Sequence, residues 1–306
     1  MITRRAFVRI SCLFPLALRL DAGEVRDHTE EVRALLMGTF VQVKGVGVPK
    51  DVLQSAVGRM RELETTFTRH GGEGSLATLN LEGTVTHAPP EFISMMERTA
   101  EAHRETSGLF DPTVLPALLV MEQHHRPLTE DERSRCRRIT GFNRVAIEGK
   151  RVTVEKGVQL TLDGVAKGYI IDEGVKRLRN DGAVSVLVNV GGDIYCGQHR
   201  KGWEVGIYDP ARDRLVRKLM LTNAAVATSG NYVNYFTEDR SAHHIIDPRT
   251  LSSPSGVTSV TVTAASTMRA DILSTAIFVA GTEGKRFLKN GETAYLLTPD
   301  SREITL

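Results

Sequence analysis

The chain has 306 residues, of which 41% are hydrophobic and 25% are charged. These proportions are typical of a globular protein with a sizeable core, and they exclude a wholly disordered chain. The formal net charge is only +2, whereas a general nucleic-acid binder needs a strongly basic domain, so we expect no nucleic-acid partner.

Residues 1–22 have the pattern of a targeting segment. They contain the pair Arg4-Arg5, which is typical of a twin-arginine export signal, followed by the apolar stretch Ile10–Leu18. This stretch is too short to span a membrane, and no apolar run elsewhere is long enough, so we expect no transmembrane segment. We therefore predict an exported or periplasmic protein, with inner-membrane association as a further option, and a folded domain over 23–306. A basic amphipathic tail without an export role is the alternative.

Apolar periodicity and breaker residues predict the elements of the first half of the chain. Apolar residues between Leu53 and Phe67 recur at helical spacing, and Thr129 with Glu132 forms a capping-box pattern. We expect, in chain order, a strand over Leu35–Val46, helices over Val52–Phe67, Pro90–Thr106 and Thr129–Ile139, and a hairpin of Val145–Ile147 with Val152–Val154.

The second half has more strands. We expect a short strand Leu160–Leu162, a helix Gly164–Arg179, a buried strand Val184–Val190, strands Trp203–Tyr208, Arg217–Leu221, Ala225–Thr228 and Val257–Ala264, helices Met268–Ala280 and Glu283–Leu288, and a strand Ala294–Leu297. Strands and helices are mixed without regular alternation. This order predicts an α+β fold with a mostly antiparallel sheet and flanking helices.

The cysteines do not have the spacing of a zinc site. Cys12 lies in the leader, and Cys136 and Cys196 are far apart in the sequence. A Cys136–Cys196 disulfide is one option, and two buried free thiols are the favoured one.

The turn before the helix at Gly164–Arg179 is the first candidate binding site. Gly164 permits a close approach, the helix N-terminus offers free N–H groups, and Lys167 adds a positive charge in the first turn. These features suit a phosphate. The alternative is an ordinary strand-to-helix turn with a solvated lysine, since neither a dinucleotide fingerprint nor a P-loop is present.

A second candidate is Asn189-Val190-Gly191-Gly192-Asp193, where two glycines follow a buried strand. Glycines at this place let a ligand or another backbone come close. The alternative is a simple turn that Asp193 stabilises by local hydrogen bonds.

Asp271 and Thr275 form a third candidate because residues four apart lie on one helix face. Their surroundings are apolar, and a carboxylate there is costly unless it is paired or bound to a metal. Carboxylate and hydroxyl oxygens suit Mg²⁺ rather than zinc. The alternative is that Asp271 caps its helix or forms a salt bridge near the helix start.

His244, in the segment His243–Thr250, is the fourth candidate. It could serve as an acid, a base or a hydrogen-bond donor, and a partly buried histidine satisfied by backbone is the alternative. Ser229 precedes it in a loop of small residues, but no Gly-x-Ser-x-Gly elbow is present, which disfavours a serine hydrolase.

Taken in this order, these segments resemble the ApbE family of FAD:protein FMN transferases. The residues that carry the resemblance are Met37-Gly38-Thr39, Phe110–Thr113, Gly164–Tyr169 with Asp172, Asn189–Asp193, Trp203–Ile207, Thr228–Gly230, His244–Thr250 and Ala270–Ala276. Each motif is weak alone, but their number and order make the match specific.

The resemblance implies a single T-fold-like domain that binds FAD as a substrate together with Mg²⁺. It also implies an enzyme that cuts the FAD pyrophosphate and attaches FMN through a phosphoester to a threonine or serine hydroxyl, releasing AMP. The partner would be an acceptor flavoprotein with an FMN-binding domain, of the kind used in respiratory and other redox chains.

The family's site residues can be carried over by motif. His244 and Asp271 would be catalytic, and the metal would be held by Asp271, Thr275 and the carbonyl of Gly164. The FAD-binding residues would be Met37, Phe110, Asp111, Pro112, Thr161, Asp163, Lys167, Asp193, Ser229 and Ile246.

The chain departs from the family at one position. The usual pattern before the lysine is Asp-Leu-Gly-Gly, whereas this chain has Thr161-Leu162-Asp163-Gly164. Residues 161 and 163 of a strand face the same side. We therefore predict that Asp163 replaces the usual FAD-contacting carboxylate.

Three functions stay open at this point. The favoured one is the FMN transferase, and the others are an FAD-binding protein without transfer activity and an FAD pyrophosphatase that releases FMN and AMP. Intact Asp271, Thr275 and His244 argue against the binding protein. Transfer and hydrolysis differ in how water is excluded from the site.

Overall fold

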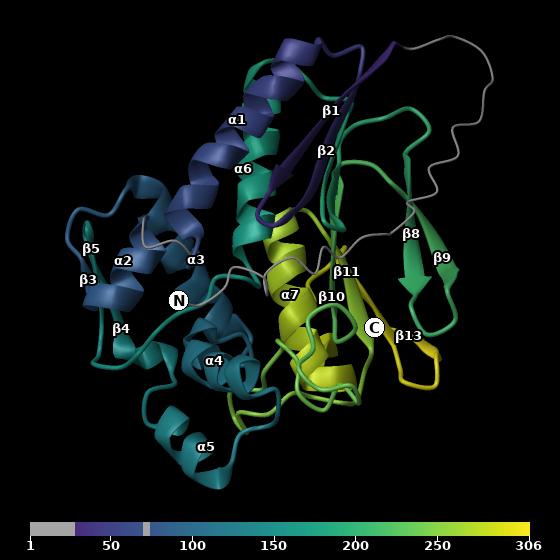
Figure 1. Ribbon diagram of the computed structural model, residues 1–306. Coiled ribbons are helices and arrows are strands. Elements are labelled where there is room, and N and C mark those ends of the chain that lie inside the picture. Colours follow the sequence, from purple (N-terminus) through teal and green to yellow (C-terminus); the bar gives the residue numbers. More distant parts are fainter. Residues whose placement is uncertain (1–27, 70–73) are drawn as a thin grey trace, which may run out of the picture.

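The computed structural model describes residues 28–69 and 74–306 (Figure 1). The predicted leader over 1–22 lies outside the described residues. Within them, no helix is both long enough and apolar enough to cross a membrane.

One eight-stranded sheet organises the described chain, in the order β1-β2-β6-β7-β10-β11-β12-β13. Its strands are β1 (Thr29–Leu36), β2 (Thr39–Val46), β6 (Val186–Val190), β7 (Asp193–Cys196), β10 (Ala224–Gly230), β11 (Ser259–Ala264), β12 (Thr293–Leu297) and β13 (Glu303–Thr305). Every neighbouring pair is antiparallel, which confirms the predicted α+β fold with an antiparallel sheet.

Three helices cover one face of this sheet: α1 (Lys50–Phe67), α6 (Ala166–Asn180) and α7 (Thr267–Ala280) (Figure 1). Helix α1 buries the apolar stripe that its sequence predicts. Helix α7 is buried on almost all sides because it packs against both α6 and the strands β10 and β11. The main core lies between these helices and the sheet.

A two-stranded sheet covers part of the opposite face. It consists of β8 (Trp203–Asp209) and β9 (Arg214–Leu221). Trp203 and Val205 pack there with Leu187, Ile194 and Val226 of the main sheet. Strand β7 is therefore buried throughout its length, including Asp193 at its first position.

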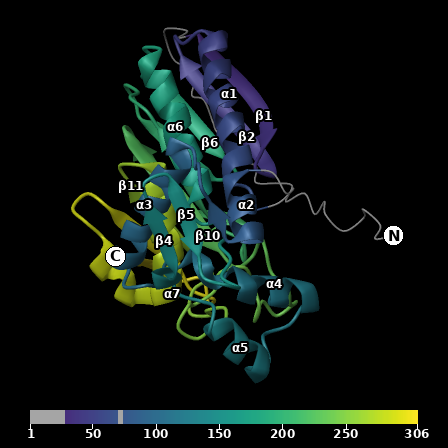
Figure 2. The ribbon, with the colours of Figure 1, turned by 90° about the vertical axis from the view of Figure 1, so that its left-hand side faces the viewer.

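The remaining elements lie outside the main sheet and its three helices, and some of them add buried side chains, such as Phe92 and Met95, to the main core. They are α2 (Ser75–Glu82), α3 (Pro90–Glu105), α4 (Leu115–His124), α5 (Glu130–Arg137), a small sheet of β3 (Thr84–Val85), β4 (Val145–Glu148) and β5 (Arg151–Val154), and 3₁₀ turns at Pro112–Val114, Phe142–Arg144 and Gly281–Phe287. Seen from the side, α5 lies below the layer formed by α1, α6 and α7 (Figure 2).

Two predicted strands are wrong. The segment Leu35–Val46 is a hairpin, because Met37 and Gly38 turn the chain with φ values of +52° and +68°. Leu160–Leu162 is not a strand, because the backbone N–H and C=O of Leu160 bond the side chain of Asn80, at 2.7 and 2.8 Å, rather than a neighbouring strand.

Cys136 and Cys196 are both buried free thiols. This confirms the favoured option and makes the alternative disulfide wrong. Burial raises the pKa of Cys196 to about 12, so its thiol stays protonated and unreactive at neutral pH.

Candidate functional site

Three charged side chains meet where α6 begins. Lys167 lies in the first turn of α6, and its Nζ atom is 2.5 Å from Oδ2 of Asp193, the first residue of β7. Asp271 of α7 completes the group: burial alone would lower the pKa of Lys167, but the carboxylates of Asp193 and Asp271 raise it. Lys167 is thus a permanently charged cation, not a freely solvated lysine.

Asp193 is placed by the turn between β6 and β7. Gly191 and Gly192 have φ values of +58° and +101°, and a Cβ atom on Gly191 would lie 2.7 Å from Oγ1 of Thr39. The side chain of Asn189 accepts a hydrogen bond from the Gly192 N–H at 3.0 Å. Asn189 therefore stabilises the turn, and the Asp193 carboxylate is left to face Lys167.

Asp271 is a buried carboxylate and not a helix cap. Its side chain is almost fully covered, and its Oδ2 accepts a hydrogen bond from the Gly168 N–H at 3.2 Å. The N-terminus of α7 is capped instead by Ser266 and by Asp172 of α6, whose carboxylate accepts from the N–H groups of residues 267 and 268. Burial, and next the charge of Asp193, raise the pKa of Asp271 to about 7.

Thr275 lies one turn further along α7, as its spacing predicts. Its Oγ1 is 3.1 Å from Oγ of Ser229, which also lies 2.7 Å from Oγ of Ser274. Gly164 approaches the same threonine closely, since a Cβ atom on Gly164 would lie 3.1 Å from Thr275 Oγ1 and 3.3 Å from the ring of Phe110. The structure therefore brings together Gly164, Thr275, Ser229 and Phe110.

The carboxylate of Asp271 and the hydroxyl of Thr275 are oxygen donors of the kind that suits a magnesium ion. Among the described residues, no group of three or more His, Cys, Asp or Glu side chains is placed to hold a metal, so a site made wholly of such ligands is not found there. Mg²⁺ needs fewer protein ligands, because it keeps waters and shares substrate phosphates. A carboxylate whose pKa is raised to about 7 is stabilised in its charged form by a bound cation.

His244 is held by a hairpin-like segment that folds back on itself. Its backbone N–H donates to the carbonyl of Asn234 at 3.0 Å, and its Nδ1 lies 2.9 Å from the same oxygen. Because a carbonyl can only accept, Nδ1 carries the proton and Nε2 is left as an acceptor. Burial lowers the pKa of His244, while the charges of Asp163 and Lys167 act on it in opposite directions. The lowered pKa favours the neutral form of His244.

His243 plays a different part. It is fully buried, its Nε2 donates to the carbonyl of Pro254 at 2.9 Å, and its Nδ1 accepts from the Ile245 N–H at 3.3 Å. Both ring nitrogens are therefore used within the fold, which describes a core histidine rather than a catalytic one.

The segment Phe110–Pro112 borders the turn at residues 161–164. The carbonyl of Pro112 accepts a hydrogen bond from the Thr161 N–H at 2.9 Å. Asp111 is buried, and its Oδ1 accepts from the N–H of Thr113 at 2.9 Å, capping the 3₁₀ turn. Burial raises the pKa of Asp111. Its carboxylate is thus engaged within the fold, and its contact with FAD stays a prediction.

Asp163 and Thr161 form one small unit. The hydroxyl of Thr161 accepts a hydrogen bond from the Asp163 N–H at 3.2 Å, and the Asp163 side chain is 56% exposed. The Thr161 hydroxyl is therefore used within the turn, while the Asp163 carboxylate is exposed. The contact of Asp163 with FAD stays a prediction.

Met37 and Ile246 take no part in the hydrogen bonds described above for the other predicted site residues. The N–H of Met37 donates to Oε1 of Glu64 on α1 at 2.5 Å, and Ile246 is buried in a separate cluster against α4. Their contact with FAD remains a prediction.

Two residues of the site were missed by the sequence analysis. Ser274 lies beside Ser229, and its position three residues after Asp271 could have placed it on the same helix face. Asn234 acts through its backbone carbonyl, so no residue type signals it.

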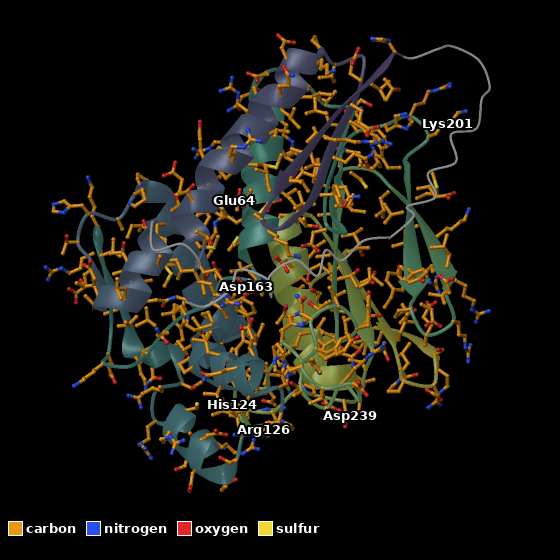
Figure 3. All side chains as sticks on the ribbon, viewed as in Figure 1. Glu64, His124, Arg126, Asp163, Lys201 and Asp239 are labelled. Carbon is orange, nitrogen blue, oxygen red and sulfur yellow. The ribbon has the colours of Figure 1, made fainter. Side chains whose placement is uncertain are left out.

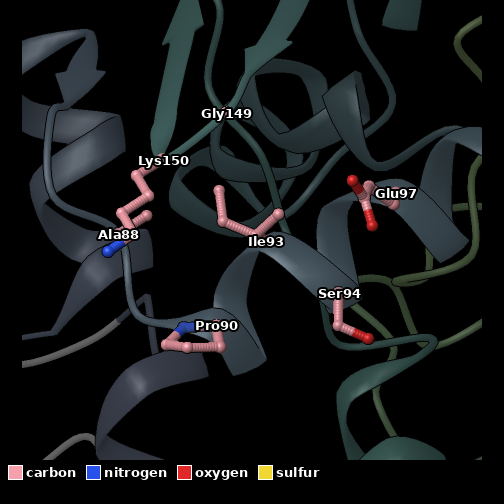
Figure 4. Close-up of a pocket in the computed structure, with 7 residues that line it drawn as sticks. All are labelled: Ala88, Pro90, Ile93, Ser94, Glu97, Gly149 and Lys150. Atoms are coloured by element: carbon pink, nitrogen blue, oxygen red, sulfur yellow. The ribbon is translucent and has the colours of Figure 1, made fainter.

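A pocket of about 260 Å³ opens elsewhere, between the start of α3 and the turn from β4 to β5 (Figure 4). It is lined by Ala88, Pro90, Ile93, Ser94, Glu97, Gly149 and Lys150. None of the predicted site residues lines it.

Known proteins are similar to this chain in sequence and in fold. The ApbE family matches residues 37–297. A protein of Vibrio cholerae named FAD:protein FMN transferase is 30% identical over 272 residues, covering 81% of this chain and 80% of its own. A protein of Haemophilus influenzae with the same name is 26% identical and covers 92% and 90%.

Solved structures show the same similarity to ApbE proteins in their fold. The ApbE protein of Thermotoga maritima has a TM-score of 0.83 at 27% identity, over 90% of this chain and 96% of its own. The flavinyl transferase ApbE of Pseudomonas stutzeri, in its apo form, has a TM-score of 0.79 at 27% identity, over 92% and 94%. With its fold and the order of its site residues, the chain belongs to the ApbE family.

Proposed function

We propose that this protein transfers FMN from FAD to a threonine or serine hydroxyl of an acceptor flavoprotein, with Mg²⁺ and with release of AMP. The observation that carries the proposal is His244, whose Nδ1 is engaged by the Asn234 carbonyl so that Nε2 is left as an acceptor. A general base is of use where a hydroxyl must be deprotonated. The names of the relatives support the same activity.

Binding of the diphosphate is the first task. Lys167, in the first turn of α6, would attract the phosphate groups through its ammonium group. The helix N-terminus itself contributes less than the sequence predicts, because the N–H groups of Ala166 and Gly168 already donate to Leu162 and Asp271. Asp271, Thr275 and the Gly164 carbonyl would hold Mg²⁺, which when bound offsets negative charge on the diphosphate. Asp193 keeps Lys167 charged and in place.

Activation of the acceptor is the second task. The acceptor hydroxyl would give its proton to Nε2 of His244 while its oxygen bonds to the phosphorus of the FMN half. The bond from that phosphorus to the bridging oxygen of the diphosphate breaks, and AMP leaves with that oxygen. The Asn234 carbonyl stabilises the protonated ring through Nδ1–H.

The decisive experiment weighs the product. The protein would be incubated with FAD, Mg²⁺ and an FMN-binding acceptor domain that carries a target threonine, and the acceptor analysed by mass spectrometry. We expect the acceptor to gain the mass of one FMN, and we expect no gain without Mg²⁺, with Asp271→Asn, or with the target threonine replaced by alanine.

The other two candidate functions give different results. Free FMN and AMP with an unmodified acceptor would indicate a pyrophosphatase. Intact, tightly bound FAD would indicate a binding protein without transfer activity. Testing several acceptor domains separates these outcomes from a mismatched acceptor.

We further propose that residues 1–22 direct export and that the protein acts in the periplasm or at the inner membrane. The pair Arg4-Arg5 supports this. A reporter fused after residue 22 should be exported, and the double change Arg4→Lys with Arg5→Lys should keep it in the cytoplasm. Export that continues in the double variant would refute the twin-arginine route.

A further inference from the structure

We propose that Arg69 is a positioning residue for FAD, which acts by fixing the carboxylate of Asp163 so that this carboxylate can accept a hydrogen bond from a hydroxyl or amino group of FAD. The inference rests on the proposed function, because it takes FAD as the ligand.

The two residues are far apart in the sequence and meet at the site. Arg69 follows the C-cap of α1, and its Nε donates to Oδ2 of Asp163 at 3.1 Å. The arginine side chain is only 13% exposed, whereas that of Asp163 is 56% exposed. The guanidinium therefore lies on the covered side of the pair, and the carboxylate is presented outward.

Asp163 is fixed at a second point as well. Its N–H donates to the hydroxyl of Thr161 at 3.2 Å, which restrains the backbone while Arg69 restrains the side chain. Within the part of the chain that the structure describes, Arg69 bonds the carboxylate at Oδ2. Oδ1 is then the atom through which a ligand can be bound.

The pair belongs to the wall of the candidate site. Asp163 directly precedes Gly164, where a Cβ atom would lie 3.1 Å from Oγ1 of Thr275 and 3.3 Å from the ring of Phe110; Figure 3 labels Asp163. An unpaired carboxylate at this place would repel the diphosphate of FAD. The positive charge of Arg69 offsets that repulsion, so the carboxylate can serve the polar groups of FAD at less cost.

The pair also gives a physical account of the sequence departure at residues 161–164. Thr161 cannot supply a carboxylate and instead holds the turn. Asp163 is in a turn rather than a strand, so its direction is not fixed by strand alternation. Arg69 supplies the direction that the strand would have given.

The test measures the dissociation constant for FAD from the change in flavin fluorescence, with Mg²⁺ and without an acceptor. We expect Arg69→Gln and Asp163→Asn each to weaken FAD binding about tenfold. The double variant should be no weaker than either single variant, because the two residues act through one another. Arg69→Lys keeps the charge but loses the directed Nε bond, so its loss should be intermediate.

A charge swap separates positioning from stability. Arg69→Asp combined with Asp163→Arg can restore an ion pair, and with it the melting temperature, but it places the carboxylate on the other chain segment. We therefore expect FAD binding to stay weak in the swapped variant. Arg61→Gln, on an exposed position of α1, is the matched control and should bind FAD normally.

Two results would overturn the inference: an Arg69→Gln dissociation constant within twofold of the wild type, or losses in the two single variants that simply add. If the wild-type protein itself does not bind FAD, the proposed function fails instead. The two failures are therefore distinguishable.

Discussion

Lys167 and Asp193 form an ion pair in which the carboxylate is 2% exposed and the lysine side chain is 31% exposed. The carboxylate is tolerated in the core because the ammonium group neutralises it. The lysine can reach a ligand from the same position. The same ion pair should therefore affect both the stability of the fold around β7 and the binding of phosphate.

Lys167→Met should reduce both stability and FAD binding. The change leaves Asp193 buried without its cation, and we expect the free energy of unfolding to fall by about 3 kcal/mol. Lys167→Met combined with Asp193→Asn should recover part of this loss, since residue 193 then carries no charge, whereas the buried Asp271 still lacks its cation. FAD binding should stay weak in both variants, because the cation is absent. Denaturant unfolding and fluorescence titration measure the two effects, and recovery of FAD binding in the double variant would show that Lys167 does not contact the substrate.

Thr275 offers a sharp test of the metal site. Thr275→Val keeps the shape of the side chain but removes the hydroxyl that lies near Ser229. We expect the Mg²⁺ concentration for half-maximal FMN transfer to rise about tenfold, about 1.4 kcal/mol in binding free energy. Thr275→Ser retains the hydroxyl and should stay close to the wild type. Equal behaviour of the valine and serine variants would remove Thr275 from the proposed ligands.

Much of this site could be predicted from the sequence because its parts are local. The spacing of Asp271 and Thr275, the glycines before Asp193 and the position of Lys167 at a helix start are all features of short segments. The helix α1 was predictable for the same reason, since its apolar stripe has one clear period.

The remainder depends on contacts between distant segments. Nothing near Leu160 indicates that its backbone is bonded by Asn80, 80 residues earlier, and a strand was predicted there. The pairing of Arg69 with Asp163 spans 94 residues. The Asn234 carbonyl that sets the tautomer of His244 is a backbone group. Every residue type has such a carbonyl, so the sequence gives no sign of this contact.

Gly168 should not tolerate a side chain. A Cβ atom there would lie 2.6 Å from the Cα of Met268 and from the carbonyl oxygen of Thr267, so α6 and α7 would have to separate. We expect Gly168→Ala to lower the free energy of unfolding by about 1–3 kcal/mol and to weaken FAD binding, because the Gly168 N–H holds Asp271.

Gly58 on α1 provides the control for this change. Among the described residues, no atom outside its own helix backbone and chain neighbours lies within 4 Å of a Cβ atom built there. Gly58→Ala should therefore be neutral or stabilising, by up to about 1 kcal/mol. If the two alanine variants melted alike, close packing of α6 on α7 would not be the reason for Gly168.

His243 should make the protein less stable in acid. Burial lowers its pKa from 6.5 to about 4, so between these values the unfolded chain binds a proton that the folded protein does not. The free energy of unfolding should thus fall as the pH drops from about 6.5 to 4, by up to about 3 kcal/mol from this residue, and the loss should level off below that range.

The raised pKa of Asp271 acts in the opposite direction between pH 7 and 4, so the wild type must be compared with a variant. His243→Gln should be less stable at pH 7 but should lose less stability on acidification, as measured by denaturant unfolding at pH 7, 6 and 5. An unchanged pH slope in the variant would mean that His243 is not the group responsible.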